Sequence, residues 1–310
     1  MDRRCSYIVV IDAESVADLR EFAAYLSDLG VAKCDVIILD DSPEHTFARH
    51  RRVLCWVGRH MKPRPRHRAA SGEVDVFRAA QDLASCEKVI VADPNVRYSA
   101  QALDELCAML EAHEAVGPQD YFEPMPWWTA VEAGRMLVHR GIEPLPDHGA
   151  TFGFRRSALR NAPALDARTL VPGESVFVRR LPPQLYQWID ERPRQADDDF
   201  DFPVKTAFFF AIIPLALLLA AAGGIRLAGT YTGVIAFGAF ALAVRGRIGA
   251  AQFFPMRACL LAPLWVFERA VSVYWALFRR AVLILRREAP QDLAPTSDSG
   301  SPALTARSRS

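Results

Sequence analysis

The chain has 310 residues, a formal net charge of +1 and 51% hydrophobic residues. This length allows one large domain or two, and the near-neutral charge argues against nucleic acid as a partner. The six cysteines show no C-x-x-C spacing, which favours reduced thiols over a disulfide framework or a zinc site. The apolar start at residues 7–11 is too short for the h-region of a signal peptide, so we expect the N-terminal part to stay in the cytoplasm.

Short apolar runs alternate with helical spacings over the first third of the chain. Strands are expected at 7–11, 35–39 and 87–92, and helices at 14–29, 73–85 and 99–113. The expected strands are apolar throughout and lack the alternation of a half-exposed sheet. This order and this pattern predict the α/β class, with a mostly parallel sheet flanked by helices.

Acidic residues follow each of the three expected strands. They are Asp12 and Glu14 after the first, Asp40 and Asp41 after the second, and Asp93 after the third. Because ligands of parallel α/β sheets bind at the carboxyl ends of the strands, these side chains predict one binding site at that edge. Aspartate is also common in turns, so a purely structural role is the alternative.

A basic segment lies between the second and third expected strands. Residues 49–68 contain eight Arg or Lys and no acid, which suits either a solvated loop or a contact with phosphate or a lipid headgroup. His45, His50, His60 and His67 lie in or near this segment without metal-ligand spacing, and we expect them to be solvated.

Aromatic and proline residues gather at 118–128, which reads PQDYFEPMPWW. Trp127 and Trp128 could pack beside the sheet or offer a platform for an acceptor, because aromatic rings stack on the apolar faces of sugars.

Two apolar runs, 206–222 and 228–244, predict a pair of membrane spans. The first has 17 residues without a charge, at the short end of the range that crosses a bilayer, and Pro214 is tolerated in such helices. The alternative is a pair of buried core helices, but a run that is apolar on every face argues against a half-exposed helix.

Charges around the two runs predict an orientation. Arg226 is the only charge between the runs, whereas Arg245 and Arg247 follow the second. The positive-inside rule therefore places the N-terminal domain at the cytoplasmic face of a cell membrane, with two passes. After the spans, 263–285 has helical apolar spacing interrupted by charges and predicts an interfacial amphipathic helix.

This reading divides the chain into three parts. Residues 1–200 form a cytoplasmic domain, 205–288 a membrane region, and 289–310 a tail rich in Ser, Pro and Ala that we expect to be disordered.

Four short segments occur in a distinctive order along the chain. They are VIVADPNVRY at 89–98, YFEPMPWW at 121–128, GATFGFRRSAL at 149–159 and APLWVFERA at 262–270. Together they resemble segments of membrane-anchored family 2 glycosyltransferases, and the resemblance spans roughly residues 5–285. It implies a glycosyltransferase A-type fold that binds a nucleotide-sugar at the acidic strand ends Asp12, Glu14, Asp40, Asp41 and Asp93.

The resemblance also implies a divalent cation, Mg²⁺ or Mn²⁺, which would neutralise the diphosphate leaving group. The family's D-x-D motif corresponds to Asp93-Pro94-Asn95, so the metal ligands would be Asp93 and Asn95. Asn95 supplies a neutral oxygen where the motif has a carboxylate, which predicts a weak site.

Members of this family carry an acidic pair after the GFRRSAL-like segment, and this pair supplies the catalytic base. Here the stretch is shorter, and its acids are Asp166 and Glu174, which become the candidate bases. Residues 194–200 resemble the family's arginine-containing segment ahead of the membrane, and place Arg194 and Gln195 on the acceptor side with Trp127 and Trp128.

The sequence therefore predicts a membrane-anchored glycosyltransferase of the hexosyltransferase type. It would move a sugar from a nucleotide-sugar donor to a lipid or other membrane-proximal glycan acceptor at the cytoplasmic face. The alternative is a degenerate, non-catalytic nucleotide-sugar binder or membrane scaffold, because the D-x-D motif and the acidic pair are both altered. No P-loop or G-x-G-x-x-G supports an unrelated nucleotide-binding protein.

Overall fold

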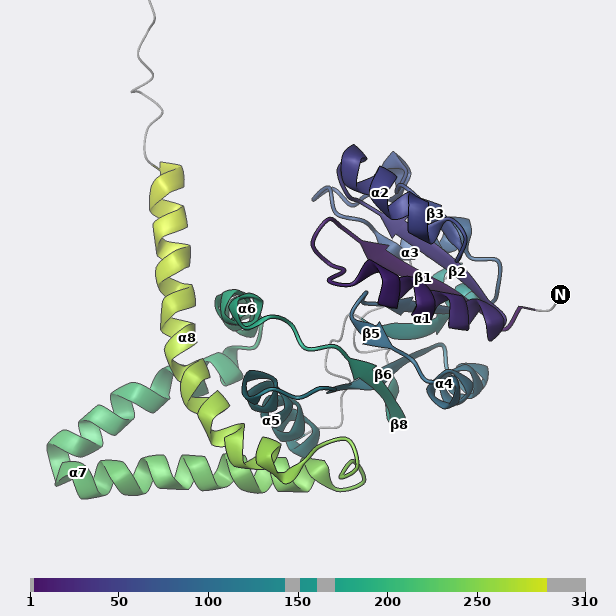
Figure 1. Cartoon of the computed structure of the whole chain (residues 1–310). Coiled ribbons are helices and arrows are strands. Elements are labelled where there is room, and N and C mark those ends of the chain that lie inside the picture. Colours follow the sequence, from purple (N-terminus) through teal and green to yellow (C-terminus); the bar gives the residue numbers. More distant parts are fainter. Residues whose placement is uncertain (1–2, 143–150, 161–170, 289–310) are drawn as a thin grey trace, which may run out of the picture.

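A computed structural model describes residues 3–142, 151–160 and 171–288 of the chain. Figure 1 shows a sheet with short helices at the N-terminal end and a group of long helices beside it. The tail 289–310 and the candidate base Asp166 lie outside the described residues.

The described residues form an eight-stranded mixed sheet with the order β3-β2-β1-β4-β7-β6-β8-β5. Its strands are β1 (Cys5–Ile11), β2 (Cys34–Asp40), β3 (Arg59–Met61), β4 (Lys88–Ala92), β5 (Val96–Arg97), β6 (Ala115–Phe122), β7 (Phe152–Arg155) and β8 (Val171–Arg180). The strands run parallel except β7, which is antiparallel to β4 and β6, and β5, which is antiparallel to β8. The predicted fold class, a mostly parallel sheet flanked by helices, is confirmed.

Both faces of the sheet are buried, which explains the continuous apolar strands. In β1, Tyr7 and Val9 face a core that includes Phe22 of α1 and Leu103 of α4, whereas Ile8 faces the opposite core. The covering helices are α1 (Leu19–Val31), α2 (Glu44–Leu54), α3 (Val76–Leu83) and α4 (Ala100–Ala112). Successive side chains of a strand point to opposite faces, so a sheet covered on both faces needs apolar residues at every position.

Local capping sets where the first helices begin. The expected helix at 14–29 starts later, at Leu19, because the Asp18 carboxylate accepts hydrogen bonds from the backbone of Arg20 and Glu21. Ser99 caps α4 as predicted, accepting from the Ala102 backbone nitrogen at 3.1 Å. The basic segment 49–68 is not a simple loop, because its first part completes α2 and its middle forms β3.

Two of the segments that carry the family resemblance meet in the core. The Tyr98 hydroxyl lies 2.7 Å from the Thr151 hydroxyl, which in turn donates to the Val91 carbonyl oxygen at 3.0 Å. All three residues are buried. The strand end near Asp93 is therefore joined to the start of β7 by a buried polar chain.

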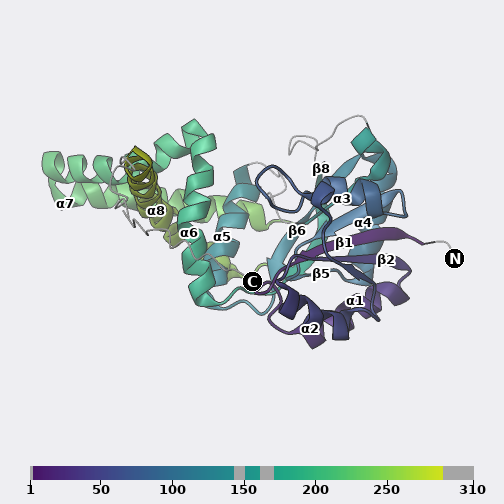
Figure 2. The same ribbon diagram turned by 90° about the horizontal axis from the view of Figure 1, so that it is seen from above.

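The remaining helices form a second core beside the sheet. They are α5 (Trp127–Ile142), α6 (Leu185–Asp198), α7 (Pro203–Arg247) and α8 (Met256–Glu288). Figures 1 and 2 show α5 and α6 lying between the sheet and the long helices. Helix α8 packs against the first half of α7, where Trp265 contacts Phe209 and the Tyr274 hydroxyl donates to the Phe210 carbonyl oxygen at 2.6 Å.

Glycines allow α5 to approach both long helices at backbone distance. A Cβ added at Gly134 would lie 2.8 Å from the carbonyl oxygen of Ala258 in α8, and one added at Gly141 would collide with the carbonyl oxygen of Leu242 in α7. Ala258 and Ala262 are themselves small, as at close helix contacts within membranes. Helix α5 thus ties the sheet to α7 and α8.

Helix α7 bends sharply at Gly224, which has φ of +73° and therefore needs glycine. The two predicted spans, 206–222 and 228–244, lie on the two sides of this bend. Side chains near the bend such as Leu217, Leu218 and Ile225 are exposed. Figure 1 places the bend far from the sheet.

Two helices, α7 and the Met256–Val282 part of α8, are long and apolar enough to cross a membrane by length and composition. In α7, 11% of the most apolar window is buried inside the structure, so most of this window faces away from the rest of the protein. The predicted interfacial helix at 263–285 is part of the longer α8, and its placement relative to a bilayer stays a prediction.

Candidate functional site

The parallel strands bring the predicted site residues to one edge of the sheet. Strands β1, β2, β4, β6 and β8 point the same way, so their carboxyl ends share an edge. Asp12 follows β1, Asp40 ends β2, Asp93 follows β4, and Arg180 ends β8. As predicted, the acidic residues that follow or end the parallel strands lie at the same edge of the sheet.

The loop after β1 is held by its own first residue. One carboxylate oxygen of Asp12 accepts from the backbone nitrogens of Glu14 at 2.9 Å and Ser15 at 2.8 Å. Asp12 and Glu14 are both exposed. Asp12 therefore shapes this turn, and its contact with a nucleotide stays a prediction, as does that of Glu14.

The buried Asp40 carboxylate is hydrogen-bonded to other residues of the protein. Its Oδ2 lies 2.9 Å from Nδ1 of His50 and 2.8 Å from Nε2 of His60, and its Oδ1 accepts from the Ser42 backbone nitrogen at 3.0 Å. Burial opposes the charge, but the hydrogen bonds from His60 and Ser42 outweigh it and lower the pKa of the Asp40 carboxyl. The expectation that these histidines are solvated was wrong, because both His50 and His60 are buried on Asp40.

Much of the basic segment pairs with carboxylates. Arg68 binds both oxygens of the Asp41 carboxylate, and Arg59 donates to Asp35 at 2.6 Å. His67 is buried and bonded to Asp82 at 3.0 Å, so it too is not solvated. These contacts give several of the basic residues partners within the protein. Both carboxylate oxygens of Asp41 already accept hydrogen bonds from Arg68.

Asp93 heads a tight turn that is fixed on both sides. Its Oδ1 accepts from the Asn95 backbone nitrogen at 2.7 Å, and the Asn95 carbonyl oxygen accepts from the Leu181 nitrogen at 2.8 Å. Arg97 donates to the Pro94 carbonyl oxygen at 2.6 Å. The Asp93-Pro94-Asn95 turn is therefore fastened to the end of β8.

Arg180 stands between two carboxylates at this edge. Its terminal nitrogens lie 3.4 Å from Asp120 Oδ2 and 3.7 Å from Asp93 Oδ2. The exposed fractions of the Arg180, Asp93 and Asp120 side chains are 29%, 18% and 7%. Burial disfavours the guanidinium charge, but Asp120 and Asp93 outweigh this effect and raise the pKa of Arg180.

Two further carboxylates approach the edge from the helices. Glu132 of α5 is buried and pairs with Arg135 at 2.6 Å and with Arg192 of α6 at 2.7 Å. Glu191 of α6 is exposed, yet its pKa is raised, first by desolvation and further by repulsion from Glu132 and Asp93, although Arg180 and Arg192 oppose the shift. A carboxyl with a raised pKa beside a site is a candidate proton acceptor.

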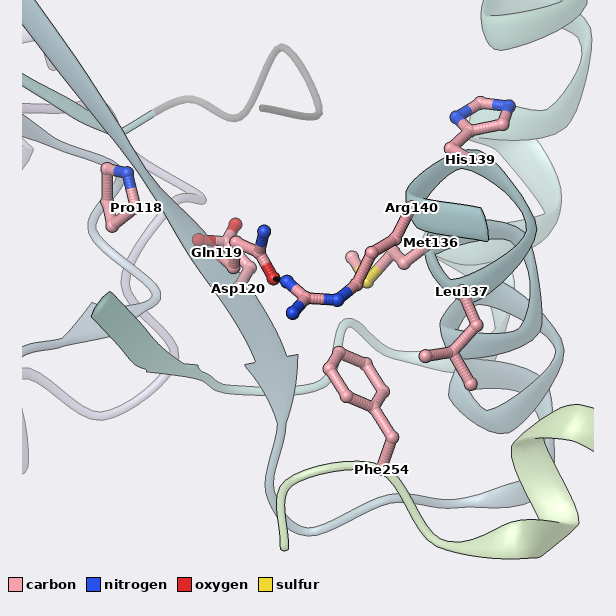
Figure 3. A pocket seen from close by; sticks show the side chains of 8 residues that line it. All are labelled: Pro118, Gln119, Asp120, Met136, Leu137, His139, Arg140 and Phe254. Atoms are coloured by element: carbon pink, nitrogen blue, oxygen red, sulfur yellow. Dashed lines mark hydrogen bonds between the residues drawn. The ribbon is translucent and has the colours of Figure 1, made fainter. Parts of the chain in front are cut away.

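A small pocket adjoins Asp120 between β6 and α5, as Figure 3 shows. Arg140 of α5 reaches across it, donates to the Gln119 side-chain oxygen, and lies over the ring of Phe177 at 5.6 Å. Met136 and Phe254 form apolar walls. The pocket thus reaches from the sheet edge to the helices that could meet a membrane.

The predicted acceptor residues lie on α5 and α6. Trp127 is 57% exposed and makes edge contacts with Trp128 and with Trp188 of α6. On α6, Arg194 is exposed, whereas the side-chain oxygen of Gln195 accepts from Arg269 of α8 at 3.2 Å. The structure brings the tryptophans together beside α6, and their role toward an acceptor stays a prediction.

Glu174 is the fourth residue of β8, and its role as a base stays a prediction. The register of β8 against β6 shifts in this part of the strand, where Pro172 pairs with Gly117 and Phe177 pairs with Gln119. The second candidate base, Asp166, is outside the described residues.

The described residues at Asp93 do not fit a divalent cation. No group of three or more His, Cys, Asp or Glu side chains in 3–142, 151–160 and 171–288 is arranged to hold a metal ion. The Arg180 guanidinium already lies between Asp93 and Asp120. A doubly charged cation about 4 Å from it would be repelled by about 8 kcal/mol at an effective dielectric constant of about 20.

Sequence reasoning missed Asp120, Arg180 and Glu191. A signal existed for the last, because Asp190-Glu191 is an adjacent acidic pair on the helix after β8. Asp120 lies in the segment 118–128, where the aromatic and proline residues are the dominant pattern. Arg180 had no local signal, because the sheet order alone brings β8 beside the turn after β4.

Comparisons with known proteins leave the family open. No family model matches the chain, and no curated protein matches it. Among solved structures, a mannosyltransferase from Pyrobaculum calidifontis in complex with GDP-mannose and Mn²⁺ is similar, with a TM-score of 0.45, 15% identity and coverage of 88% of each chain. A TM-score of this size decides neither the fold nor the chemistry of this chain.

Proposed function

We propose that this protein is a membrane-anchored glycosyltransferase that moves a sugar from a nucleotide-sugar to a lipid or other membrane-proximal acceptor at the cytoplasmic face. The observation that carries the proposal is the cluster of Asp93, Asp120 and Arg180 at the carboxyl edge of the sheet, facing α5 and α6. The ordered segments that resemble family 2 glycosyltransferases support it, and one of them contains Asp93.

The reaction moves the glycosyl group between two oxygens. The acceptor hydroxyl oxygen forms a bond to the anomeric carbon, and the bond from that carbon to the diphosphate oxygen breaks with its electron pair on the diphosphate. The hydroxyl proton passes to a carboxylate. General-base help of this kind is worth roughly 10²–10⁴ in rate.

Glu191 is the carboxylate that suits the role of base among the described residues. It lies on α6, where the charges of Arg180 and Asp93 act on it, and its pKa is raised. A base of higher pKa accepts a proton more readily, provided it is ionised at the working pH. Glu191 is chosen over Glu174 in this proposal because the charges of Arg180, Asp93 and Glu132 act on it.

The long helices support a membrane-proximal acceptor. Helix α5 contributes Glu132 to the site and packs against α7 and α8 through its glycines. The exposed Trp127 lies at the start of the same helix. An acceptor lying in the headgroup region would therefore meet aromatic side chains on its way to the sheet edge, as amphipathic rings favour that region.

A non-catalytic nucleotide-sugar binder is the second candidate. Asn95 in the place of a D-x-D carboxylate favours it. Purified full-length protein in lipid nanodiscs, incubated with UDP- and GDP-sugars and lipid extract, separates the two: release of nucleoside diphosphate supports the enzyme, whereas binding without turnover supports the binder.

Asp93→Ala should weaken binding of a nucleoside diphosphate at least tenfold, or about 1.4 kcal/mol. The Asn95 backbone would lose its acceptor, and Arg180 would lose one of its two carboxylates. Calorimetry with UDP and GDP on the full chain measures the change. Unchanged affinity in a folded Asp93→Ala variant would show that Asp93 serves the turn alone.

The orientation can be tested by labelling. In a Cys55→Ser, Cys86→Ser background, a cysteine introduced at the exposed Ser71 should resist membrane-impermeant maleimide in intact cells and react after lysis. Arg226→Cys, in the short turn between the two predicted spans, is the matched control and should react from outside. Labelling of the Ser71 position in intact cells would refute the cytoplasmic placement.

A further inference from the structure

We propose that Arg180 takes the place of the divalent cation, so that this protein binds the diphosphate of its donor without a metal. This inference rests on the proposed function and adds to it how the leaving group is held. The ligand is the diphosphate of a nucleotide-sugar, and the residue is one that the family resemblance did not assign.

The position of Arg180 is the first support. It ends β8 beside the Asp93-Pro94-Asn95 turn, and Asp93 and Asp120 flank its guanidinium at 3.7 and 3.4 Å. The Asp93 carboxylate is one that a cation at the D-x-D position would need. The carboxylates hold the guanidinium at the carboxyl edge of the sheet, where ligands of such sheets bind.

Arg180 also keeps donors for a ligand, in contrast with its neighbour Arg97. The Arg97 guanidinium donates to both carboxylate oxygens of Glu21, at 2.9 and 2.6 Å, and to the backbone carbonyl oxygens of Pro94 and Val96. All three of its nitrogens therefore have acceptors within the protein. Among the described residues, the contacts of Arg180 are long, and 29% of its side chain is exposed. A guanidinium has five N–H donors in a planar fork that matches phosphate oxygens.

The charges around the site are balanced without a metal. The carboxylates are those of Asp93, Asp120, Glu132 and Glu191, and the cations are Arg135, Arg140, Arg180 and Arg192. A diphosphate that approached Arg180 would therefore not meet a large excess of negative charge. Asn95 is neutral and adds no charge to this balance.

The experiment uses the full-length protein in nanodiscs and measures binding of UDP and GDP by calorimetry, in EDTA and in Mn²⁺ or Mg²⁺. We expect the better nucleotide to bind with the same affinity, within about twofold, in all three buffers. Arg180→Ala should weaken it tenfold or more in each buffer, because charge-assisted hydrogen bonds to phosphate are lost. Arg180→Lys should retain part of the affinity, since it keeps the charge without the fork.

Arg179→Ala is the matched control. Arg179 is the preceding residue of β8, is exposed, and donates to the Glu123 carbonyl oxygen on the other face of the strand. We expect this substitution to leave the affinity unchanged. Thermal melts of each variant show whether it is folded. The comparison of EDTA with Mn²⁺ or Mg²⁺ is made on the unmodified protein, so it does not depend on the folding of any variant.

The outcomes separate two failures. If nucleotide binding needs Mn²⁺ or Mg²⁺ and is lost in EDTA, the inference about Arg180 is overturned while the proposed function stands. Unchanged affinity in folded Arg180→Ala overturns it as well. If neither nucleotide binds in any buffer, the proposed function fails and this inference fails with it.

Discussion

Replacing Gly246 with alanine should destabilise the chain by about 3 kcal/mol, the upper part of the range for overpacking. A Cβ at Gly246 would collide with the Leu137 carbonyl oxygen of α5 and lie 2.9 Å from the Gly141 backbone nitrogen. Backbone atoms on both helices cannot turn aside as a flexible side chain can, so the helices must separate. Thermal unfolding in a defined detergent measures the loss.

Gly238→Ala is the control for this prediction. Gly238 lies on the same half of α7, and no described atom lies within 4 Å of the position of its Cβ. The same chemical change should there be neutral or stabilising by about 0.5–1 kcal/mol, because alanine favours helix over glycine. Equal melting temperatures for the two variants would mean that α5 and α7 are not in backbone contact.

Glu191→Gln should reduce turnover of the donor by roughly 10²–10⁴, the usual contribution of a general base, while nucleotide affinity changes little. The substitution keeps the shape of the side chain and removes its ability to take the proton. Asp190→Asn, at the exposed neighbouring position, is the control and should keep most activity. Turnover that survives in Glu191→Gln would leave Asp166 and Glu174 as the candidates.

The same residue predicts a pH dependence. A base works in its ionised form, so turnover falls as the pH falls through its pKa. Desolvation with repulsion from Glu132 and Asp93 raises the pKa of Glu191, and Arg180 and Arg192 oppose this. The acidic limb of the rate profile should therefore lie above the ordinary glutamate value and should vanish in Glu191→Gln. A limb that persists in the variant would belong to another group.

Sequence patterns were sufficient where the information is local. The strands β1, β2 and β4 and the cap of α4 by Ser99 follow from runs of a few residues, and the acidic strand ends follow from the parallel order. Burial of Asp40 by His50 and His60 depends on β3 returning beside β2, which no spacing of histidines could show.

The candidate site was predicted in part for the same reason. Asp93 ends a strand that can be read directly from the sequence, so its position was predicted. Arg180 and Asp120 reach it through the strand order β4-β7-β6-β8, in which β7 runs antiparallel between two parallel parts. The family resemblance indicates a base soon after the GFRRSAL segment, which points to Asp166 and Glu174, whereas Glu191 lies farther along the chain on α6.

The close packing of α5 bears on how the protein can be handled and how it folds. A fragment ending at residue 200 would contain the whole sheet, yet it would leave α5 without α7 and α8, exposing Leu137 and the backbone around Gly134 and Gly141. Such a fragment should aggregate or bind detergent even though its sequence reads as that of a soluble domain. The boundary between water-soluble and apolar sequence is thus not a boundary between folding units. During synthesis, α5 can complete its packing only after α8, which follows α7 in the chain, has left the ribosome.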